Sequence, residues 1–279
     1  MNTALKIRAQ QARVGNNLIV LRALPTAQLA SVGPFVFVDH FGPLPSLNGG
    51  PSAHPHAGIE VLTWLFDGES EHRDSMGNVG RIRSGGAQWM KAGRGALHSE
   101  TMLTSAPITH GVQLWTRQPI DRQEDAPEYA HFQAEDMPDW TEGAARLRLL
   151  AGTMCEQNGV LTLGLDSLAL RVSLPAGASV DLPINPLHEI AVYGLSGTVR
   201  LLGDELARGE LVRLADGSDR IELSNHTVDA VDLLVLGGEV APQPLIFEGP
   251  FVFESRERIM QAKRDFVSGK MGQLDGVPF

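Results

Sequence analysis

The sequence predicts an all-β protein, and three observations favour that class. Short segments rich in Val, Ile, Leu, Phe and Trp recur along the chain with Gly, Pro, Asp or Asn between them, as in strands joined by turns. Asp67-Gly68 and Ser196-Gly197 each lie between two apolar segments and are expected to form tight hairpin turns. Segments with helical spacing are few. We therefore expect a β-sandwich or β-barrel rather than alternating strands and helices.

The predicted strands follow one another through both halves of the chain. In the first half they are FVFVDHFG (35–42), IEVLTWLFDGES (59–70), GRIRSGG (80–86) and GVQLWTR (111–117). In the second half they are ARLRLLAG (145–152), LALRVSLPAG (168–177), EIAVYGLSG (189–197), ELVRLADG (210–217) and DLLVLGG (232–238). The best helix signal is SRERIMQAKRDFVSGKMG (255–272), in which Ile259, Lys263 and Phe266 roughly follow helical spacing and Gly269 can end the helix.

The length of 279 residues favours two domains, each able to bury a core of its own. Between about residues 118 and 146 the chain becomes polar and acidic and contains three prolines. This stretch is the expected connection between the two halves. We expect an N-terminal domain over residues 1–130 and a C-terminal domain over residues 131–279.

An internal duplication supports two related barrels. The segments EVLTWLFDGES from Glu60 and EIAVYGLSGTV from Glu189 share an acidic start, an apolar run and a Gly turn. The pentapeptide GPFVF occurs at residues 33–37, before its barrel, and again at residues 249–253, after its barrel. We hypothesise that the terminal segments cross over and pack on the neighbouring half.

Composition excludes several classes of function. The formal net charge of -10, without clusters of Lys and Arg, argues against direct binding of nucleic acid. A single cysteine, Cys155, excludes an intramolecular disulfide and is expected to be a small buried or half-buried side chain. The N-terminal residues lack the apolar core of a signal peptide, and no run approaches the roughly 20 apolar residues of a membrane span. A cytoplasmic protein is expected.

Two pairs of polar residues carry the candidate chemistry. His54 and His56 are two residues apart, as are His98 and Glu100, so the side chains of each pair share one side of a strand. Three imidazoles and one carboxylate from two strands suit a divalent first-row transition metal. Iron(II) is the favoured ion because mixed sites with open positions suit dioxygen chemistry, and manganese, nickel, copper and zinc are the alternatives. Structural roles are expected for His72, His110, His131, His188 and His226.

Three segments together resemble the pirins, which are members of the cupin superfamily. They are HPHAGIEVLTW, EHRDSMGNVGRIRSGGAQWMKAGRGALHSE and HGVQLW, and the resemblance continues more weakly to the second GPFVF. It implies two tandem cupin (jelly-roll) β-barrels with a short C-terminal helix. It also implies that the N-terminal barrel holds one metal per chain through His54, His56, His98 and Glu100.

Glu60 leaves an alternative open. In the general cupin motif a glutamate a few residues after the histidine pair is a ligand, and Glu60 stands four residues beyond His56. The pirin pattern favours Glu100, so that Glu60 would orient a histidine or hold a proton. In the second barrel, matching Glu189 to Glu60 places Pro183 and Asn185 where the histidine pair stands, which predicts a barrel without metal ligands.

The resemblance implies quercetin 2,3-dioxygenase activity, in which the flavonol binds the metal through its 3-hydroxyl and carbon monoxide is released. Glu100 would be the catalytic base that takes the hydroxyl proton. An apolar pocket suits such a flat aromatic substrate. Candidate lining residues, which would otherwise be plain core, are Trp89, Met90, Gln113 and Trp115. The alternative is a non-enzymatic, iron-dependent redox sensor or interaction protein that modulates a transcription factor or a metabolic enzyme.

Overall fold

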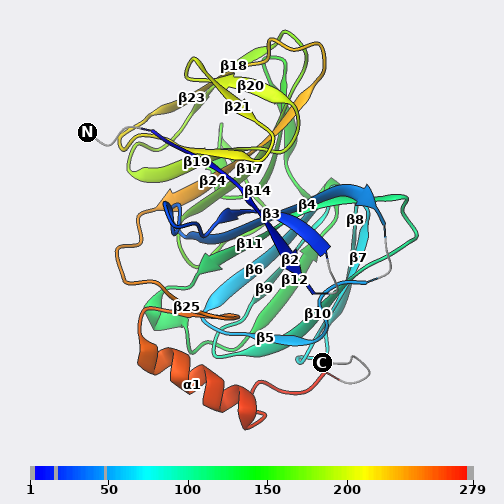
Figure 1. The fold of residues 1–279 in the computed structure, drawn as a ribbon, viewed down its shortest axis with the longest axis vertical. Helices are drawn as coiled ribbons and strands as arrows, with labels where there is room; N and C mark the ends of the chain where they lie inside the picture. Colours follow the sequence, from blue (N-terminus) through cyan, green and yellow to red (C-terminus); the bar gives the residue numbers. More distant parts are fainter. Residues whose placement is uncertain (1–3, 16–17, 47–48, 275–279) are drawn as a thin grey trace. The chain divides into compact units, whose positions relative to one another are not determined.

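The computed structural model describes residues 4–15, 18–46 and 49–274, which form strands β1 to β26, two 3-10 helices and one α-helix. The predicted all-β class is confirmed. The chain divides into two compact units, and each contains a seven-stranded and a four-stranded sheet within the described residues (Figure 1). No helix among these residues has the length and apolar character needed to cross a membrane.

The first unit, here called the N-terminal barrel, comprises Gln11–Val20, Val38–Glu135 and Pro242–Phe279. Its seven-stranded sheet has the order β12-β9-β6-β11-β4-β3-β2, and its four-stranded sheet has the order β5-β10-β7-β8. The strands are β2 (Gln10–Val14), β3 (Leu18–Leu24), β4 (Phe35–Pro45), β5 (His54–His56), β6 (Ile59–Asp67), β7 (Glu69–Asp74), β8 (Val79–Arg83), β9 (Ala87–Lys91), β10 (Ala96–Met102), β11 (Ile108–Arg117), β12 (Glu128–Phe132), β25 (Ile246–Glu248) and β26 (Phe251–Phe253). The helices are η1 (Ile120–Arg122), η2 (Ala134–Asp136) and α1 (Arg256–Val267).

The second unit, here called the C-terminal barrel, comprises Met1–Gln10, Leu21–Phe37 and Asp136–Ala241. Its sheets have the orders β1-β22-β19-β24-β17-β14-β13 and β18-β23-β20-β21, and β15 and β16 form a separate hairpin. The strands are β1 (Leu5–Arg8), β13 (Asp139–Glu142), β14 (Ala145–Ala151), β15 (Thr153–Met154), β16 (Gln157–Asn158), β17 (Ser167–Leu174), β18 (Ser179–Pro183), β19 (His188–Gly194), β20 (Thr198–Leu201), β21 (Asp204–Ala207), β22 (Glu210–Arg213), β23 (Arg220–Ser224) and β24 (Val231–Glu239).

The terminal segments are exchanged between the two halves of the sequence, as hypothesised. Strand β1 pairs antiparallel with β22, and the Gly33 amide of the first GPFVF copy donates to Glu189 Oε2 at 2.8 Å. The second copy lies on the N-terminal barrel, where Phe251 forms a β-bridge with Ala57. A side chain on Gly58 would meet the Val252 carbonyl at 2.3 Å, so this close approach requires glycine. The expected domain ranges 1–130 and 131–279 divide the chain at a single point, so they do not describe the exchange of the terminal segments.

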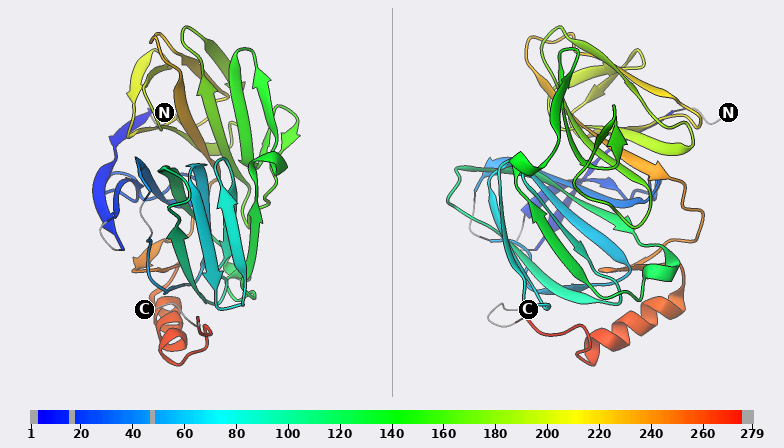
Figure 2. Two further views of the ribbon diagram at one scale, coloured as in Figure 1. Left: turned by 90° about the vertical axis from the view of Figure 1, so that its right-hand side faces the viewer. Right: turned by 180° about the vertical axis from the view of Figure 1, so that it is seen from behind.

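The predicted C-terminal helix is confirmed as α1. Ser255 caps its N-terminus by accepting a hydrogen bond from the Arg258 amide, and Ile259 and Ala262 are buried on one side. They pack with Leu97 and the aromatic rings of β26, so α1 covers one end of the N-terminal barrel, as the red helix in Figure 2 shows.

The predicted hairpin turns at Asp67-Gly68 and Ser196-Gly197 are wrong. The first joins β6 to β7 and the second joins β19 to β20, and in both cases the two strands belong to different sheets of one barrel. Both glycines have positive φ, at 113° and 64°. An apolar run that ends in Gly therefore indicates a sharp bend but does not distinguish a hairpin from a corner between sheets.

The acidic stretch predicted as a connection contains two strands, β12 and β13. Along the chain, the boundary between the longest segment of each unit lies within this stretch, between Glu135 and Asp136. Before that point β12 pairs with β9 and places Tyr129 opposite Met90, so this polar strand forms the edge of the seven-stranded sheet. Because its side chains are partly exposed, β12 has no apolar run from which the strand could be predicted.

Candidate metal centre

The two predicted polar pairs lie on neighbouring strands. Strands β5 and β10 pair antiparallel, with His54 opposite His98 and His56 opposite Ala96. Residues that face each other across an antiparallel pair share one side of the sheet, as do residues two apart on one strand. The register therefore brings His54, His56, His98 and Glu100 to the same face, as the spacing predicted.

Strand β7 lies on the other side of β10 and adds two more polar residues to this face. His72 is opposite Glu100, and Asp74 is opposite His98. Both are buried, as are His56, His98 and Glu100. Three short strands thus line one wall of the N-terminal barrel with ionisable side chains.

Three imidazoles converge in the first group, which consists of His54, His56 and His98. One ring nitrogen from each lies within 4.8 Å of the others. The Nδ1 atoms of His54 and His56 lie 2.8 Å from the Ser52 carbonyl oxygen and 3.1 Å from the Pro250 carbonyl oxygen. Because a carbonyl oxygen only accepts, each Nδ1 carries the proton and each Nε2 keeps a lone pair. That is the tautomer in which an imidazole binds metal through Nε2.

The electrostatics of the site favour neutral rings at His56 and His98. Burial, followed by the nearby His54, lowers the pKa of both His56 and His98 well below the ordinary value of 6.5. A metal ligand must be unprotonated, so these two histidines are ready to bind at neutral pH. Two ligand nitrogens that lie ~2.1 Å from one ion at a right angle are about 3 Å apart. The 3.1 Å between His54 Nε2 and His98 Nε2 fits that arrangement.

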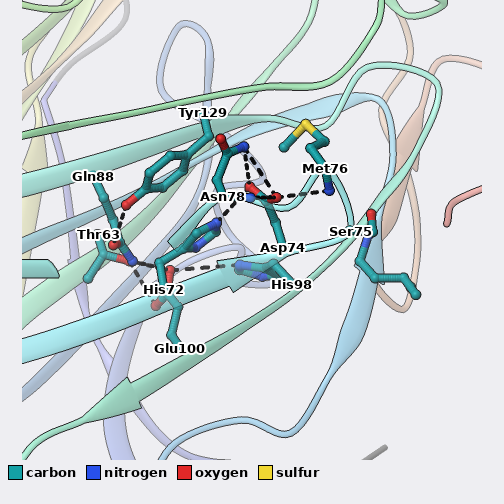
Figure 3. Close-up of polar contacts among 11 residues, drawn as sticks. Thr63, His72, Asp74, Ser75, Met76, Asn78, Gln88, His98, Glu100 and Tyr129 are labelled. Carbon is teal, nitrogen blue, oxygen red and sulfur yellow. Dashed lines mark hydrogen bonds and ion pairs between the residues drawn. The ribbon is translucent and has the colours of Figure 1, made fainter. Parts of the chain in front are cut away.

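Glu100 lies beside His98 but belongs to a second group, which consists of His72, His98 and Glu100. Its Oε1 is 4.0 Å from His98 Nδ1, a buried atom that has no hydrogen-bond partner among the described residues. Thr63 Oγ1 donates to both carboxylate oxygens, at 2.7 and 2.9 Å, and Gln88 Nε2 donates to Oε1 at 2.9 Å (Figure 3). The four predicted ligands therefore share one wall, with the three imidazoles together and the carboxylate adjacent.

His72 is the main site residue that sequence reasoning missed. Its Nε2 lies 3.1 Å from Asp74 Oδ2, and its ring stacks on Tyr129 with 4.1 Å between centroids (Figure 3). Asp74 in turn accepts from the backbone amides of Met76 and Asn78. The signal was available, because His72 and Asp74 are two residues apart on a strand, like the pairs at 54 and 98.

Glu60 lies in neither group that the described residues form. Strand β5 ends at His56, and Gly58 with a φ of 78° stands before β6 begins, so strand alternation does not carry over from His56 to Glu60. Glu60 is buried and accepts a hydrogen bond from Trp89 Nε1 at 3.1 Å.

Two of the four candidate lining residues contact the site. Trp115 meets the His56 ring edge to face, with 4.9 Å between centroids. Gln113 lies opposite Thr63 in the register of β6 and β11, and its Nε2 donates to the Leu62 carbonyl oxygen. Of the other two, Trp89 donates to Glu60 and Met90 is buried in β9.

In the C-terminal barrel, Pro183 and Asn185 do not occupy interior positions. Both are exposed, whereas Leu182 beside them is fully buried. With His188 and Asp166 they line a cavity of ≈ 290 Å³ at the ends of β17, β18 and β19. His188 Nε2 lies 3.2 Å from Asp166 Oδ2.

Two β-barrels of this topology in one chain, with a cluster of buried histidines in the first, define a bicupin. The chain matches the profile described as Pirin over residues 17–116 and the profile described as Pirin C-terminal cupin domain over residues 169–272. The protein belongs to the pirin family. Expectations of a cupin fold and of a pirin relationship are therefore confirmed.

Three similar proteins have informative names. A Pseudomonas aeruginosa protein named "Putative quercetin 2,3-dioxygenase" is 31% identical over 277 residues, which cover 98% of this chain and 87% of that protein. The crystal structure of a quercetin 2,3-dioxygenase from Acinetobacter baumannii has a TM-score of 0.93 at 25% identity, with 99% and 93% of the two chains covered. The nickel(II) complex of the bacterial pirin YhhW from Escherichia coli shares the fold, with a TM-score of 0.67 at 18% identity and 86% and 100% covered.

Proposed function

We propose that the N-terminal barrel binds one divalent transition metal through His54, His56 and His98, with Glu100 as its carboxylate ligand, and opens the ring of a flavonol with dioxygen. The observation that carries the proposal is the group of three imidazoles within 4.8 Å of one another, two of them held by backbone carbonyls with Nε2 unprotonated. Relatives of similar length that are named as quercetin dioxygenases support the choice of reaction. Iron(II) is the proposed ion because nitrogen-rich sites with a single carboxylate suit dioxygen chemistry.

In the proposed reaction the metal and Glu100 would have separate roles. A bound metal would supply Lewis acidity and open positions for the substrate oxygen and dioxygen. Glu100 would accept the proton of the flavonol 3-hydroxyl, and the hydrogen bonds from Thr63 and Gln88 would orient its carboxylate for this role. The products would be the ring-opened ester and carbon monoxide, with both oxygen atoms of dioxygen retained in the ester.

The walls around the site suit a flat aromatic substrate. Strand β6 is buried from Ile59 to Phe66, and the Trp115 ring lies against His56. Such apolar surroundings exclude water from the reacting carbon atoms and strengthen the electrostatic interactions of Glu100.

The test is oxygen uptake by protein loaded anaerobically with iron(II), measured on addition of quercetin together with release of carbon monoxide. Uptake that requires His98, with the His98→Ala protein as the control, supports a metal-dependent dioxygenase. Fully loaded wild-type protein that consumes no oxygen would refute the reaction. It would favour the alternative role, in which the metal centre senses redox state and the protein acts on a protein partner.

A further inference from the structure

The Glu100 carboxylate is held from the sheet opposite to its own. Glu100 lies on β10 in the four-stranded sheet, whereas Thr63 on β6 and Gln88 on β9 are direct partners in the seven-stranded sheet. Oε1 accepts from both residues, and within the described structure Oε2 accepts only from Thr63. Two donors from the opposite sheet therefore set the orientation of the carboxylate.

Tyr129 fixes which end of the Gln88 amide faces Glu100. The Tyr129 hydroxyl donates to Gln88 Oε1 at 3.3 Å. Burial, together with the charges of Glu100 and Asp74, raises the pKa of Tyr129, so the hydroxyl keeps its proton and acts as a donor. An amide has one accepting and one donating end, so this contact turns Nε2 toward Glu100.

The position of Tyr129 is itself constrained on two sides. Its ring stacks on His72 with an interplanar angle of 10°. A side chain at Gly80 on β8 would lie 1.9 Å from the Tyr129 hydroxyl oxygen. The φ of Gly80 is not positive, so glycine is needed there for space and not for backbone conformation. Two neighbouring strands thus hold the hydroxyl where it reaches Gln88.

We propose that Thr63, Gln88 and Tyr129 are positioning residues that fix the orientation of the Glu100 carboxylate beside the imidazoles. The inference rests on the proposed metal centre. It assigns a role to Tyr129, which comes from a polar strand in the stretch that the sequence marked only as a connection. The three residues need no contact with the substrate, because they act through Glu100.

The experiment measures cobalt(II) affinity by competition with a chelator, together with the visible absorption spectrum of the bound ion. We expect Gln88→Leu and Thr63→Val to weaken binding on the order of 10–100-fold, as loss of partners of a ligand typically does, and to change the spectrum. Thr63→Ser should restore both, and Tyr129→Phe should give a smaller change of the same kind. Thr116→Val is the matched control, because the buried Thr116 hydroxyl on β11 has no hydrogen-bond partner in the part of the chain that the structure describes.

A double-mutant cycle separates action through Glu100 from a general effect on the barrel. In a Glu100→Gln background, Gln88→Leu should weaken cobalt binding little further, because residues that act through one group are not additive. An equal loss in both backgrounds would overturn the proposal, as would wild-type affinity and spectrum in both Gln88→Leu and Thr63→Val. Circular dichroism verifies folding, and Thr63→Ser and Tyr129→Phe keep the test valid if a larger change unfolds the protein.

Failure of the proposed function gives a different result. If wild-type protein binds no cobalt, or if His98→Ala binds it as tightly as wild type, the metal centre itself is wrong and the positioning role fails with it. If cobalt binds through His98 while the Gln88 and Thr63 variants behave as wild type, only the positioning role is refuted.

Discussion

The four-stranded sheets of the two barrels have matching strand orders but opposite interior chemistry. The order β5-β10-β7-β8 in the N-terminal barrel corresponds to β18-β23-β20-β21 in the C-terminal barrel. The interior positions of the latter are all aliphatic and belong to one core cluster: Val180, Leu182, Val199, Leu201, Leu206, Ile221 and Leu223. The corresponding wall of the N-terminal barrel carries His54, His56, His72, Asp74, His98 and Glu100.

This difference shows that the barrel does not need polar residues in its wall. The corresponding wall of the C-terminal barrel consists of aliphatic side chains that pack into an apolar core. Burying imidazoles and carboxylates removes them from water and lowers stability unless partners compensate. Burial lowers the pKa values of His56 and His98, which shows that the site disfavours the charged form of these two rings. Groups whose pKa values are shifted by burial cluster at functional sites, which supports the proposed metal centre in this wall.

The largest expected effect is the loss of metal from the N-terminal barrel in His98→Ala. His98 belongs to both groups of side chains that could hold a metal, so its removal leaves neither group complete. The fold should persist, because the aliphatic wall of the C-terminal barrel shows that this topology is stable without such a site. Elemental analysis should fall from about one metal per chain to near zero with an unchanged circular dichroism spectrum. Full metal content in the variant would refute the ligand set.

The next largest effect is expected in the aliphatic wall of the C-terminal barrel. Leu223→Asp would place a carboxylate in the aliphatic wall, where the replaced side chain is only 2% exposed. An unpaired buried charge lowers stability by about 3–5 kcal/mol. Chemical denaturation should show that loss, and Glu222→Gln on the exposed face of the same strand is the control. A loss below about 1 kcal/mol would mean that the C-terminal wall tolerates charge.

A third prediction concerns pH. The folded protein lowers the pKa of His56 and His98 below the ordinary 6.5, so the unfolded chain binds protons there that the folded chain does not. The free energy of unfolding of metal-free protein should therefore fall as the pH decreases below about 6.5, by up to about 1.4 kcal/mol per pH unit for each histidine. Denaturation curves between pH 7 and pH 5 measure the slope. A His56→Gln variant should show a smaller slope, because it lacks one of the two histidines. A slope identical to that of the wild-type protein would contradict the lowered pKa of His56.

The sequence predicted the barrels and one wall of the site, because both follow from local rules. Alternation on a strand brings His54 to the side of His56 and His98 to the side of Glu100, and the register of β5 and β10 then joins the pairs. Apolar runs between turn residues indicated the strands in the same way. Both inferences need only the geometry of a single strand.

The rest of the site depends on contacts between sheets, which have no local signal. Thr63 and Gln88 reach Glu100 from the opposite sheet, and Tyr129 joins them from an edge strand with little apolar character. The turns at Gly68 and Gly197 were misjudged for the same reason, because a local bend does not tell which sheet the next strand enters. His72 was missed although the spacing rule applied to His72 and Asp74, because a structural role was expected for His72 as for the other single histidines.

The smallest expected effect is that of Glu60→Gln, which sharpens the comparison between a buried carboxylate at the site and one outside it. Glu60 is as buried as Glu100, but it is paired with Trp89 and lies in neither metal-binding group of the described structure. The amide oxygen of glutamine can still accept the Trp89 hydrogen bond, so metal content should stay near one per chain and stability should change little. Glu100→Gln, measured alongside by elemental analysis, should weaken metal binding. The reverse result, with metal lost in Glu60→Gln and kept in Glu100→Gln, would transfer the carboxylate role to Glu60.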